Sequence, residues 1–382
     1  MNDEKAAFEV LESIKKHVET LKPLLPKRAL VCIGEYPIKI MLKEPNASEN
    51  NETLPIFLGK SSDEVFKWIP EDFAQPFVWG FEDANIDTHF WYNVLPFISQ
   101  DETLIEGLKK KPIEKLHNAV IVASVWDGIG SASLPTLTSK LKASNINSLS
   151  LAILPSKIQT TDAYFNALAS LGMCASNDDA ATVVLLDRDL LENYEGVDRN
   201  GSLMNGNVVG NYLVNLLLSK ETLVQEISEL SRTFNVKMYS ALVATGASVK
   251  IYGSIENILN ATLLRPLLNF DLSSASLLYV LIRMPTRLKD NFPRAKIELE
   301  VAGWFKEKAT LKSIYITEPV YVEDGSDRID LTLFIGGFNT SEMVTDMDKK
   351  VKNMKNRAVA KGFIKEEDWQ ALMKKLEEQK EQ

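Results

Sequence analysis

Short apolar runs separated by amphipathic segments organise the first half of the chain. The runs are rich in aliphatic and β-branched residues, as strands buried on both faces of a parallel sheet are; they are Arg28–Ile33, Ala119–Ser124, Leu149–Leu154 and Ala181–Leu186. Ile38–Leu42 looks like a further strand, and Thr161–Leu171 has helical spacing. This alternation predicts a doubly wound α/β domain, which binds ligands beyond the carboxyl ends of its strands.

The second half of the chain has a different pattern. Leu203–Ser231 reads as one long helix and Ile255–Leu264 as a shorter one. Runs of strand character follow at Ala275–Arg283, Ile297–Phe305, Thr310–Ile316 and Arg328–Phe338, and a predicted helix around Lys289–Glu300 overlaps the second run. This order suits a four-stranded mixed sheet with helices on one side.

Both ends of the chain have amphipathic patterns. Apolar residues at Phe8, Leu11, Ile14, Val18 and Leu21 predict a helix over residues 3–22, ended by Pro23 and Pro26. Near the other end, a basic stretch contains Lys349, Lys350, Lys352, Lys355, Arg357 and Lys361. The helix predicted at Ile364–Leu376 carries Trp369 and Leu372 on its apolar face. Segment 349–376 could therefore dock on a protein partner or on an anionic membrane surface. The alternative is a terminal helix that is simply solvated.

Composition narrows the class of protein. The 382 residues are 45% hydrophobic and 25% charged, as in ordinary globular proteins. A net charge of −9 argues against a nucleic-acid partner, which needs a basic surface. We expect Cys32 and Cys174 to be buried thiols, and we expect a cytoplasmic protein because no signal-peptide or membrane-spanning pattern occurs.

A glycine-containing turn, Trp126–Ser133, follows the strand Ala119–Ser124 and precedes a helical pattern that begins at Leu134. Strand, glycine turn and helix together point backbone N–H groups at an anion. The run Ala123–Pro135 resembles the phosphate loop of the FtsZ/tubulin superfamily, Gly-Gly-Gly-Thr-Gly-Ser/Thr-Gly followed two residues later by proline. Gly128, Gly130 and Pro135 match that loop, and Ser131 holds its hydroxyl position.

Other segments support this resemblance, among them Pro266-Leu267-Leu268 and the strand ending Gly336-Gly337-Phe338. The chain is identified as a divergent, archaeal-type member of the FtsZ/tubulin superfamily. The resemblance implies a Rossmann-like nucleotide-binding domain, a long central helix and a second α+β domain with a four-stranded mixed sheet. The implied divisions are an N-terminal helical extension (1–27), the GTPase-type domain (28–202), the central helix (203–231), the C-terminal domain (232–340) and a charged helical tail (341–382).

The resemblance also implies a nucleotide site, whose residues would be Gly128, Gly130, Ser131, Asp187 and Asn211. That site departs from the family pattern, because Trp126 and Asp127 replace the first two glycines of the loop. An indole and a carboxylate would stand where a polyphosphate needs bare backbone and positive potential.

The catalytic loop of the family, Asn-Val-Asp-Phe-Ala-Asp, corresponds to residues 235–240. Asn235 matches, whereas Lys237 and Ser240 replace the two acids that polarise water at the next subunit's nucleotide. A protonated lysine cannot activate water as a carboxylate does. We therefore expect no catalytic residue, no metal ligand and no cofactor, with GTP or GDP and Mg²⁺ as the alternative.

These departures favour a cytoskeletal or cell-division-related pseudo-GTPase that acts by self-association into filaments or by co-assembly with an FtsZ/tubulin-like relative. The alternative is an active, polymerising GTPase in which Gly128, Gly130, Ser131 and Asn211 hold GTP and Asp187, Glu35 or another acid engages Mg²⁺. A third interpretation is a different α/β protein whose loop binds another small ligand.

Overall fold

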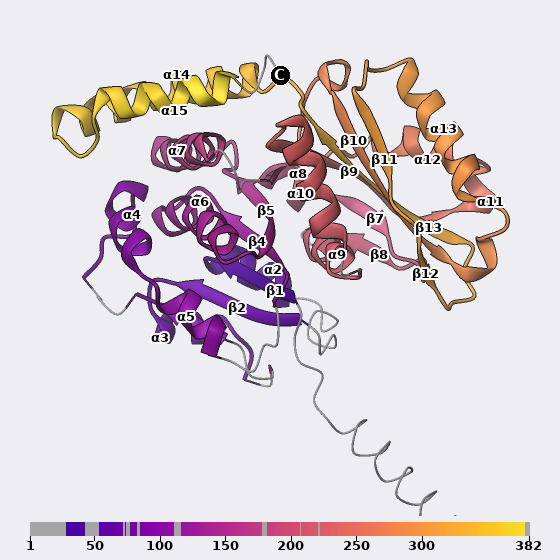
Figure 1. Cartoon of the computed structure of the whole chain (residues 1–382), viewed down its shortest axis with the longest axis horizontal. Helices are drawn as coiled ribbons and strands as arrows, with labels where there is room; N and C mark the ends of the chain where they lie inside the picture. The colour runs from indigo at the N-terminus through magenta and orange to yellow at the C-terminus, as the bar shows by residue number, and fades with distance from the viewer. Residues whose placement is uncertain are drawn as a thin grey trace, which may run out of the picture.

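The computed structural model describes residues 28–42, 53–71, 73, 77–81, 85–110, 116–177, 182–206, 208–220 and 222–378. The predicted N-terminal helical extension, residues 1–27, lies outside the described residues. One sheet runs through the molecule in the order β11-β10-β13-β9-β6-β5-β4-β1-β2-β3, and β12 pairs with β10 (Figure 1). A separate hairpin, β7-β8, lies beside it.

The first half of the sheet is parallel, as predicted. Its strands are β1 (Arg28–Ile33), β2 (Thr53–Gly59), β3 (Phe77–Gly80), β4 (Asn118–Ser124), β5 (Asn147–Leu154) and β6 (Val183–Asp187). Its helices are α2 (Glu35–Leu42), α3 (Ser62–Phe66), α4 (Trp91–Gln100), α5 (Thr103–Lys110), α6 (Gly128–Ala143), α7 (Thr161–Ser176) and α8 (Arg188–Glu192). Helices α4, α6 and α7 bury one face of the sheet, while α2 and the two helices that follow β8 bury the other.

The strand predicted at Ile38–Leu42 is wrong, because these residues belong to helix α2. The helix tolerates Pro37 because the proline lies in its first turn, where an N–H is not needed. Ile38, Ile40 and Met41 are buried. Burial of these side chains against the sheet outweighs the strand preference of the two isoleucines.

The segment predicted as a long central helix is built from three elements. Its first residues form β8 (Leu203–Asn205), which pairs with β7 (Glu195–Val197). Two helices follow, α9 (Val208–Leu217) and α10 (Leu223–Phe234). The break between them falls in a short polar stretch around Ser219 and Lys220, which offers no apolar face to bury.

The second half contains the predicted four-stranded mixed sheet. Its strands are β9 (Met238–Ser248), β10 (Leu277–Pro285), β11 (Ser313–Ile316) and β13 (Arg328–Gly336), with the short β12 (Val320–Val322) beside β10. Pairing is antiparallel for β9–β13 and β13–β10 and parallel for β10–β11. Its helices are α11 (Val249–Tyr252), α12 (Ile255–Thr262) and α13 (Arg294–Lys306). The strand predicted at Ile297–Phe305 is therefore wrong, and the overlapping helix prediction holds.

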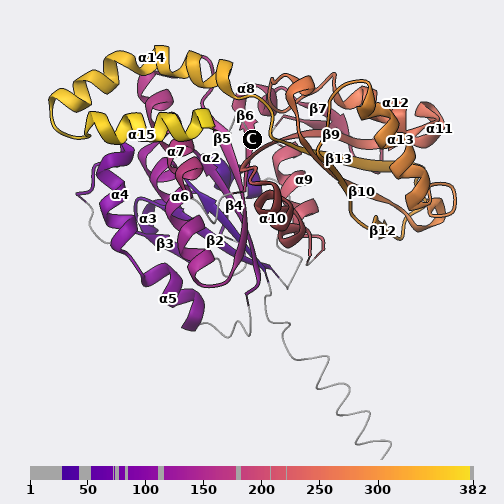
Figure 2. The same ribbon diagram turned by 45° about the horizontal axis from the view of Figure 1, so that its top comes forward.

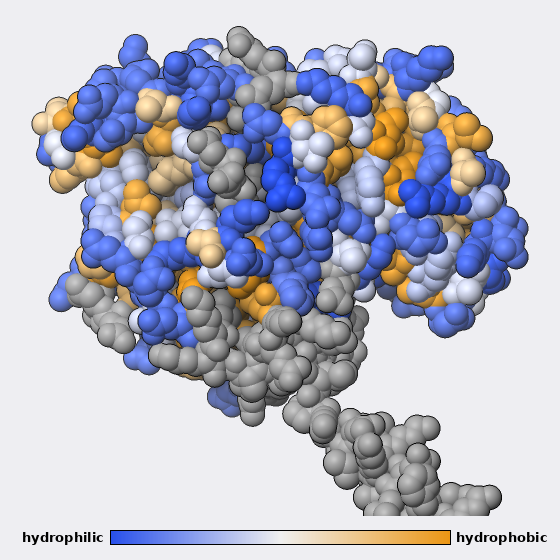
Figure 3. Space-filling view, viewed as in Figure 1, coloured by the Kyte–Doolittle hydropathy of each residue, from blue (hydrophilic) through white to orange (hydrophobic). Residues whose placement is uncertain are grey.

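The charged tail forms two helices, α14 (Ser341–Ala360) and α15 (Glu366–Glu378), which fold back over α7 of the first half (Figure 2). The apolar face that suggested a docking site is used inside the molecule. Trp369 is buried and stacks on Phe165 with ring centroids 5.0 Å apart. On the face of the molecule that Figure 3 shows, the surface of the tail is mostly hydrophilic. Among the described residues, no helix has the length and apolar character needed to cross a bilayer.

Candidate functional site

The glycine-containing turn lies at the carboxyl end of β4. This strand ends at Ser124 and α6 begins at Gly128, so Gly128, Gly130 and Ser131 all lie in the first turn of the helix. A helix N-terminus exposes N–H groups that have no partner within the helix, and these groups bind anions. The predicted strand and the helix that follows it are therefore present, but α6 begins at Gly128 and not at Leu134, so the second part of the predicted turn is helical.

The carboxylate of Asp127 already occupies this helix N-terminus. Its Oδ1 accepts a hydrogen bond from the N–H of Gly130 at 2.7 Å, and its Oδ2 accepts one from the hydroxyl of Ser124 at 2.9 Å. The N–H of Gly128 donates to the carbonyl of Thr88 at 3.1 Å. The donors that would face a phosphate are thus bonded within the chain.

The two glycines are explained by close packing. A Cβ atom on Gly130 would lie 1.8 Å from the carbonyl oxygen of Ser124, and one on Gly128 would lie 2.5 Å from the carbonyl oxygen of Thr88. Both distances are far shorter than any real contact. These positions need glycine to let α6 approach its neighbours, whether or not an anion binds.

Burial raises the pKa of the Asp127 carboxyl above its ordinary value, although the bonds from Gly130 and Ser124 oppose this shift. A carboxyl that holds its proton more tightly in the folded chain costs stability when charged, and this cost disappears as the pH falls through the raised pKa. The D127N variant keeps an oxygen for the Gly130 N–H and carries no charge. We expect its free energy of unfolding at pH 7 to equal or exceed that of the natural protein.

Urea unfolding at several pH values between 7 and 4.5 measures this effect. The natural protein should gain stability relative to D127N as the pH falls. The D127A variant is the control, since loss of the helix cap should cost about 1 kcal/mol. A D127N variant as unstable as D127A at every pH would contradict the prediction.

An aromatic and cationic cluster, which the sequence did not reveal, lies next to this helix N-terminus. Trp126 packs edge-on against Tyr36 with ring centroids 5.1 Å apart. The guanidinium of Arg188 lies 4.8 Å from the Tyr36 ring and 4.9 Å from the Trp126 ring, and it pairs with Glu192 at 2.7 Å. The Arg188 charge is thus already balanced within the chain.

Asp187 and Asn211 also have structural roles. Asp187 caps α8, where its side chain accepts from the N–H of Leu190 at 3.1 Å. Asn211 is buried in α9, and its Nδ2 donates to the carbonyl of Met41 at the end of α2 at 3.0 Å. Asn211 lines the cleft beside α9, whereas Asp127 lines a different hollow of the described structure.

The residues matched to the catalytic loop lie at the opposite edge of the sheet, where β9 begins. Asn235 ends α10 in the left-handed conformation, with φ of 54°. Lys237 is buried, and its Nζ donates to the carbonyl of Ala175 at the end of α7 at 2.7 Å. This position favours a cation, because helix C-termini are partly negative. Ser240 lies fully buried inside β9.

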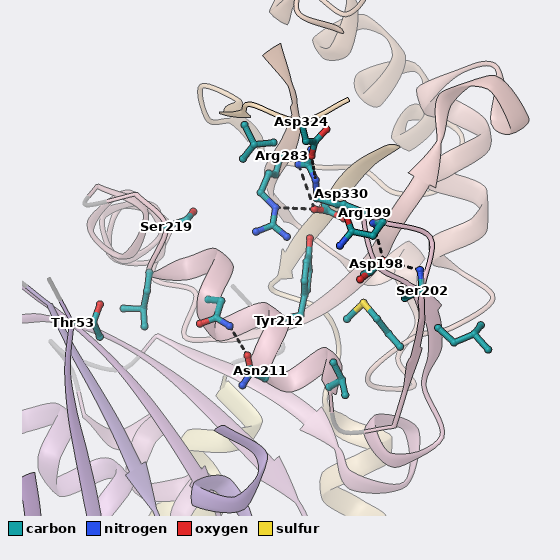
Figure 4. A pocket seen from close by; sticks show the side chains of 17 residues that line it. Thr53, Asp198, Arg199, Ser202, Asn211, Tyr212, Ser219, Arg283, Asp324 and Asp330 are labelled. Atoms are coloured by element: carbon teal, nitrogen blue, oxygen red, sulfur yellow. Dashed lines mark hydrogen bonds and ion pairs between the residues drawn. The ribbon is translucent and has the colours of Figure 1, made fainter. Parts of the chain in front are cut away.

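A cleft of about 540 Å³ separates α9 from the second half of the sheet (Figure 4). Its wall contains an ion-pair network that the sequence analysis missed. The fully buried carboxylate of Asp330 accepts from Arg283 Nε at 2.8 Å and from the N–H of Gly246 at 2.7 Å, and Arg199 lies 4.0 Å away. The sequence feature that could have revealed this network is Asp330, a charged residue within the otherwise apolar run predicted as a strand at 328–338. Among the described residues, no cluster of His, Cys, Asp and Glu is arranged to hold a metal ion.

The amino-acid sequence matches no protein-family model and no curated protein. Solved structures do match. CetZ1 from Haloferax volcanii, described as a GDP-bound monomer, has a TM-score of 0.66 at 14% identity and covers 86% of this chain and 99% of its own. CetZ from Methanosaeta thermophila has a TM-score of 0.65 at 14% identity, with 89% and 96% covered. FtsZ from M. jannaschii has a TM-score of 0.58 at 13% identity, with 86% and 96% covered. The chain has the tubulin/FtsZ fold, as the phosphate-loop resemblance predicted.

Proposed function

We propose that this protein is a filament-forming subunit that assembles, alone or with a relative, without hydrolysing GTP. One observation carries the proposal: the carboxylate of Asp127 bonds the N–H of Gly130 at the helix N-terminus where a nucleotide phosphate would bind. Because the Asp127 carboxyl already accepts from this N–H, a phosphate oxygen would have to displace it in order to bind there.

The fold supports the filament part of the proposal. CetZ2 from Haloferax volcanii, whose structure is described as a GTPγS-bound protofilament, has a TM-score of 0.64 at 16% identity to this chain. Fold alone does not carry function. The proposal therefore rests on two observations together: the structural similarity to a protofilament-forming protein, and the helix N-terminus whose Gly130 N–H is already bonded to Asp127.

The residues at the opposite edge of the sheet support the absence of hydrolysis. Lys237 is engaged with a helix C-terminus and Ser240 lies inside a strand, so neither can present a carboxylate or a free base to water. The alternative of an active GTPase would need acids from elsewhere. Asp187 is a helix cap, and the exposed Glu35 pairs with Lys39.

The test combines nucleotide analysis, calorimetry and sedimentation of the purified full chain. We expect no bound guanine nucleotide and no heat on titration with GTP and Mg²⁺, while the protein pellets above a threshold concentration and forms filaments visible by electron microscopy. A clear isotherm with phosphate release that rises with protein concentration would establish the active GTPase instead. Failure to pellet alone, with pelleting restored by an FtsZ/tubulin-like partner, would assign the co-assembly role.

A further inference from the structure

The second half of α14 and the turn that follows it contain cations but no acid. Residues 349–365 include no aspartate or glutamate, and their cations are Lys349, Lys350, Lys352, Lys355, Arg357, Lys361 and Lys365. The chain as a whole has a net charge of −9, so this stretch differs in sign from the rest. Charges of alternating sign are typical of a helix face that is only solvated, whereas a run of one sign indicates a partner of opposite charge.

Most of these cations lie on the outward side of α14. The helix packs on α7, and its buried residues are Val344, Met347, Val351 and Ala358. All seven cations except Lys355 are exposed. Lys355 pairs with Glu366 at 2.8 Å. Lys352, Arg357 and Lys361 form no ion pair with any described residue, so their charges face solvent without compensation.

An aromatic side chain stands within this basic region. Gly362 follows α14 with φ of 73°, a left-handed conformation that glycine adopts without strain and that turns the chain sharply. The ring of Phe363, the next residue, stacks on Tyr92 with ring centroids 5.2 Å apart, yet Phe363 remains 52% exposed. Lys361 and Lys365 flank it in the sequence. An open aromatic ring is therefore surrounded by positive charge.

The turn between α14 and α15 projects at one end of the molecule, beyond the helices of the first half (Figures 1 and 2). An apolar hollow of about 220 Å³ lies beside it, with a lining that includes Leu95, Pro96, Phe363, Ile364 and Leu372. A peptide ligand is usually held in a groove, whereas the cations here lie on a convex helix face. A flat bilayer can contact a projecting turn and a convex face together, with the aromatic ring below the headgroups and the cations at the lipid phosphates.

We propose that the outward face of α14 and the turn at Phe363 bind an anionic membrane surface. Phe363 enters the boundary between headgroups and acyl chains, and Lys352, Arg357 and Lys361 lie against the lipid phosphates. This contact goes beyond the proposed filament and does not depend on it, because a single subunit has the whole surface.

Flotation of the purified full chain with lipid vesicles tests the proposal, because vesicles rise in a density gradient while filaments sink. One set of vesicles is phosphatidylcholine alone, and the other contains about a third phosphatidylglycerol. We expect flotation only with the second set. We also expect added salt to release the protein, since salt screens contacts between exposed charges.

Removal of the three uncompensated cations is the main variant. Lys352→Gln, Arg357→Gln and Lys361→Gln together should weaken binding to the anionic vesicles about a hundredfold, because each Lys or Arg at such a surface contributes a similar part of the affinity. The matched control removes the same charge from exposed positions in the second half of the chain and should bind like the natural protein. It carries Lys289→Gln, Lys296→Gln and Lys306→Gln.

A second pair of variants tests the aromatic contact. Phe363→Ser should weaken binding about tenfold, because about half of the ring no longer leaves water. Phe66→Ser on α3 is the matched control, since Phe66 is 55% exposed, and it should leave binding unchanged. Thermal unfolding checks that all four variants are folded.

Three results would overturn the proposal. The first is equal flotation with both sets of vesicles, and the second is flotation of the three-glutamine variant of α14 equal to that of the natural protein. The third is no flotation at all. In that case, retention of the natural chain but not of this variant on immobilised polyglutamate would assign the basic face to an acidic protein partner instead.

Discussion

Replacing Asp330 with alanine is expected to lower the free energy of unfolding by about 3 kcal/mol, because the change leaves the partly buried guanidinium of Arg283 and the N–H of Gly246 without their shared partner. Asp330 is fully buried in β13 and bonds Arg283 on β10 and the N–H of Gly246 on β9. Loss of its carboxylate uncouples three neighbouring strands at one point. Urea unfolding followed by circular dichroism measures the change.

Two variants make this expectation specific. Asp346→Ala removes an exposed partner of Lys349 and should change stability by less than about 0.5 kcal/mol. The double variant Asp330→Leu with Arg283→Met removes both charges and should recover much of the loss, since the penalty comes from the unpaired charge. An Asp330→Ala loss below about 1 kcal/mol would show that the Arg283 charge does not depend on Asp330.

Gly130→Ala is expected to destabilise the protein by about 3 kcal/mol or more, although alanine normally favours a helix over glycine by about 1 kcal/mol. The new Cβ would lie 1.8 Å from the carbonyl oxygen of Ser124, which belongs to the backbone and cannot swing aside. Either α6 or the end of β4 must move. Thermal unfolding measures the loss of stability. Amide hydrogen exchange at residue 130 measures whether its N–H is still bonded to Asp127.

Gly303→Ala on α13 is the matched control. Nothing lies within 4 Å of a Cβ at this helical position, so the ordinary preference for alanine should raise stability by about 1 kcal/mol. Opposite signs at two helical glycines test whether close approach, rather than helix preference, governs residue 130. Equal effects at both positions would contradict the packing argument.

Much of the fold could be predicted from periodicity. The buried parallel strands and the four-stranded mixed sheet follow from continuous or alternating apolar runs, because such runs must be covered on one or both faces. The errors at residues 38–42 and 297–305 share one cause. Both segments are short and rich in apolar residues, and such a segment can be buried against a sheet either as a strand or as a helix. The spacing of its apolar residues therefore does not distinguish a strand from a helix.

The candidate site could be predicted only in part. The sequence placed Asp127 in the segment between β4 and α6, but it did not show that the carboxylate turns back to bond Gly130 and Ser124. A side chain's bonding partner depends on packing of segments distant in sequence, as the contact of Arg188 with Tyr36 and Trp126 shows. Asn211 illustrates the same limit, since its partner Met41 lies 170 residues away.

The tail helices have a consequence for the order of synthesis. Trp369 covers Phe165 of α7. Leu372 packs so closely on α7 that a Cβ atom added to Gly172 would lie 2.8 Å from the Cβ of Leu372. Phe165 leaves the ribosome roughly 200 residues before Trp369, an interval of about 10–40 s at ordinary translation speed. During that time the newborn first half carries an uncovered aromatic surface on α7. We therefore expect this surface to need protection until α15 has been made, and we expect a chain truncated before residue 341 to keep it exposed.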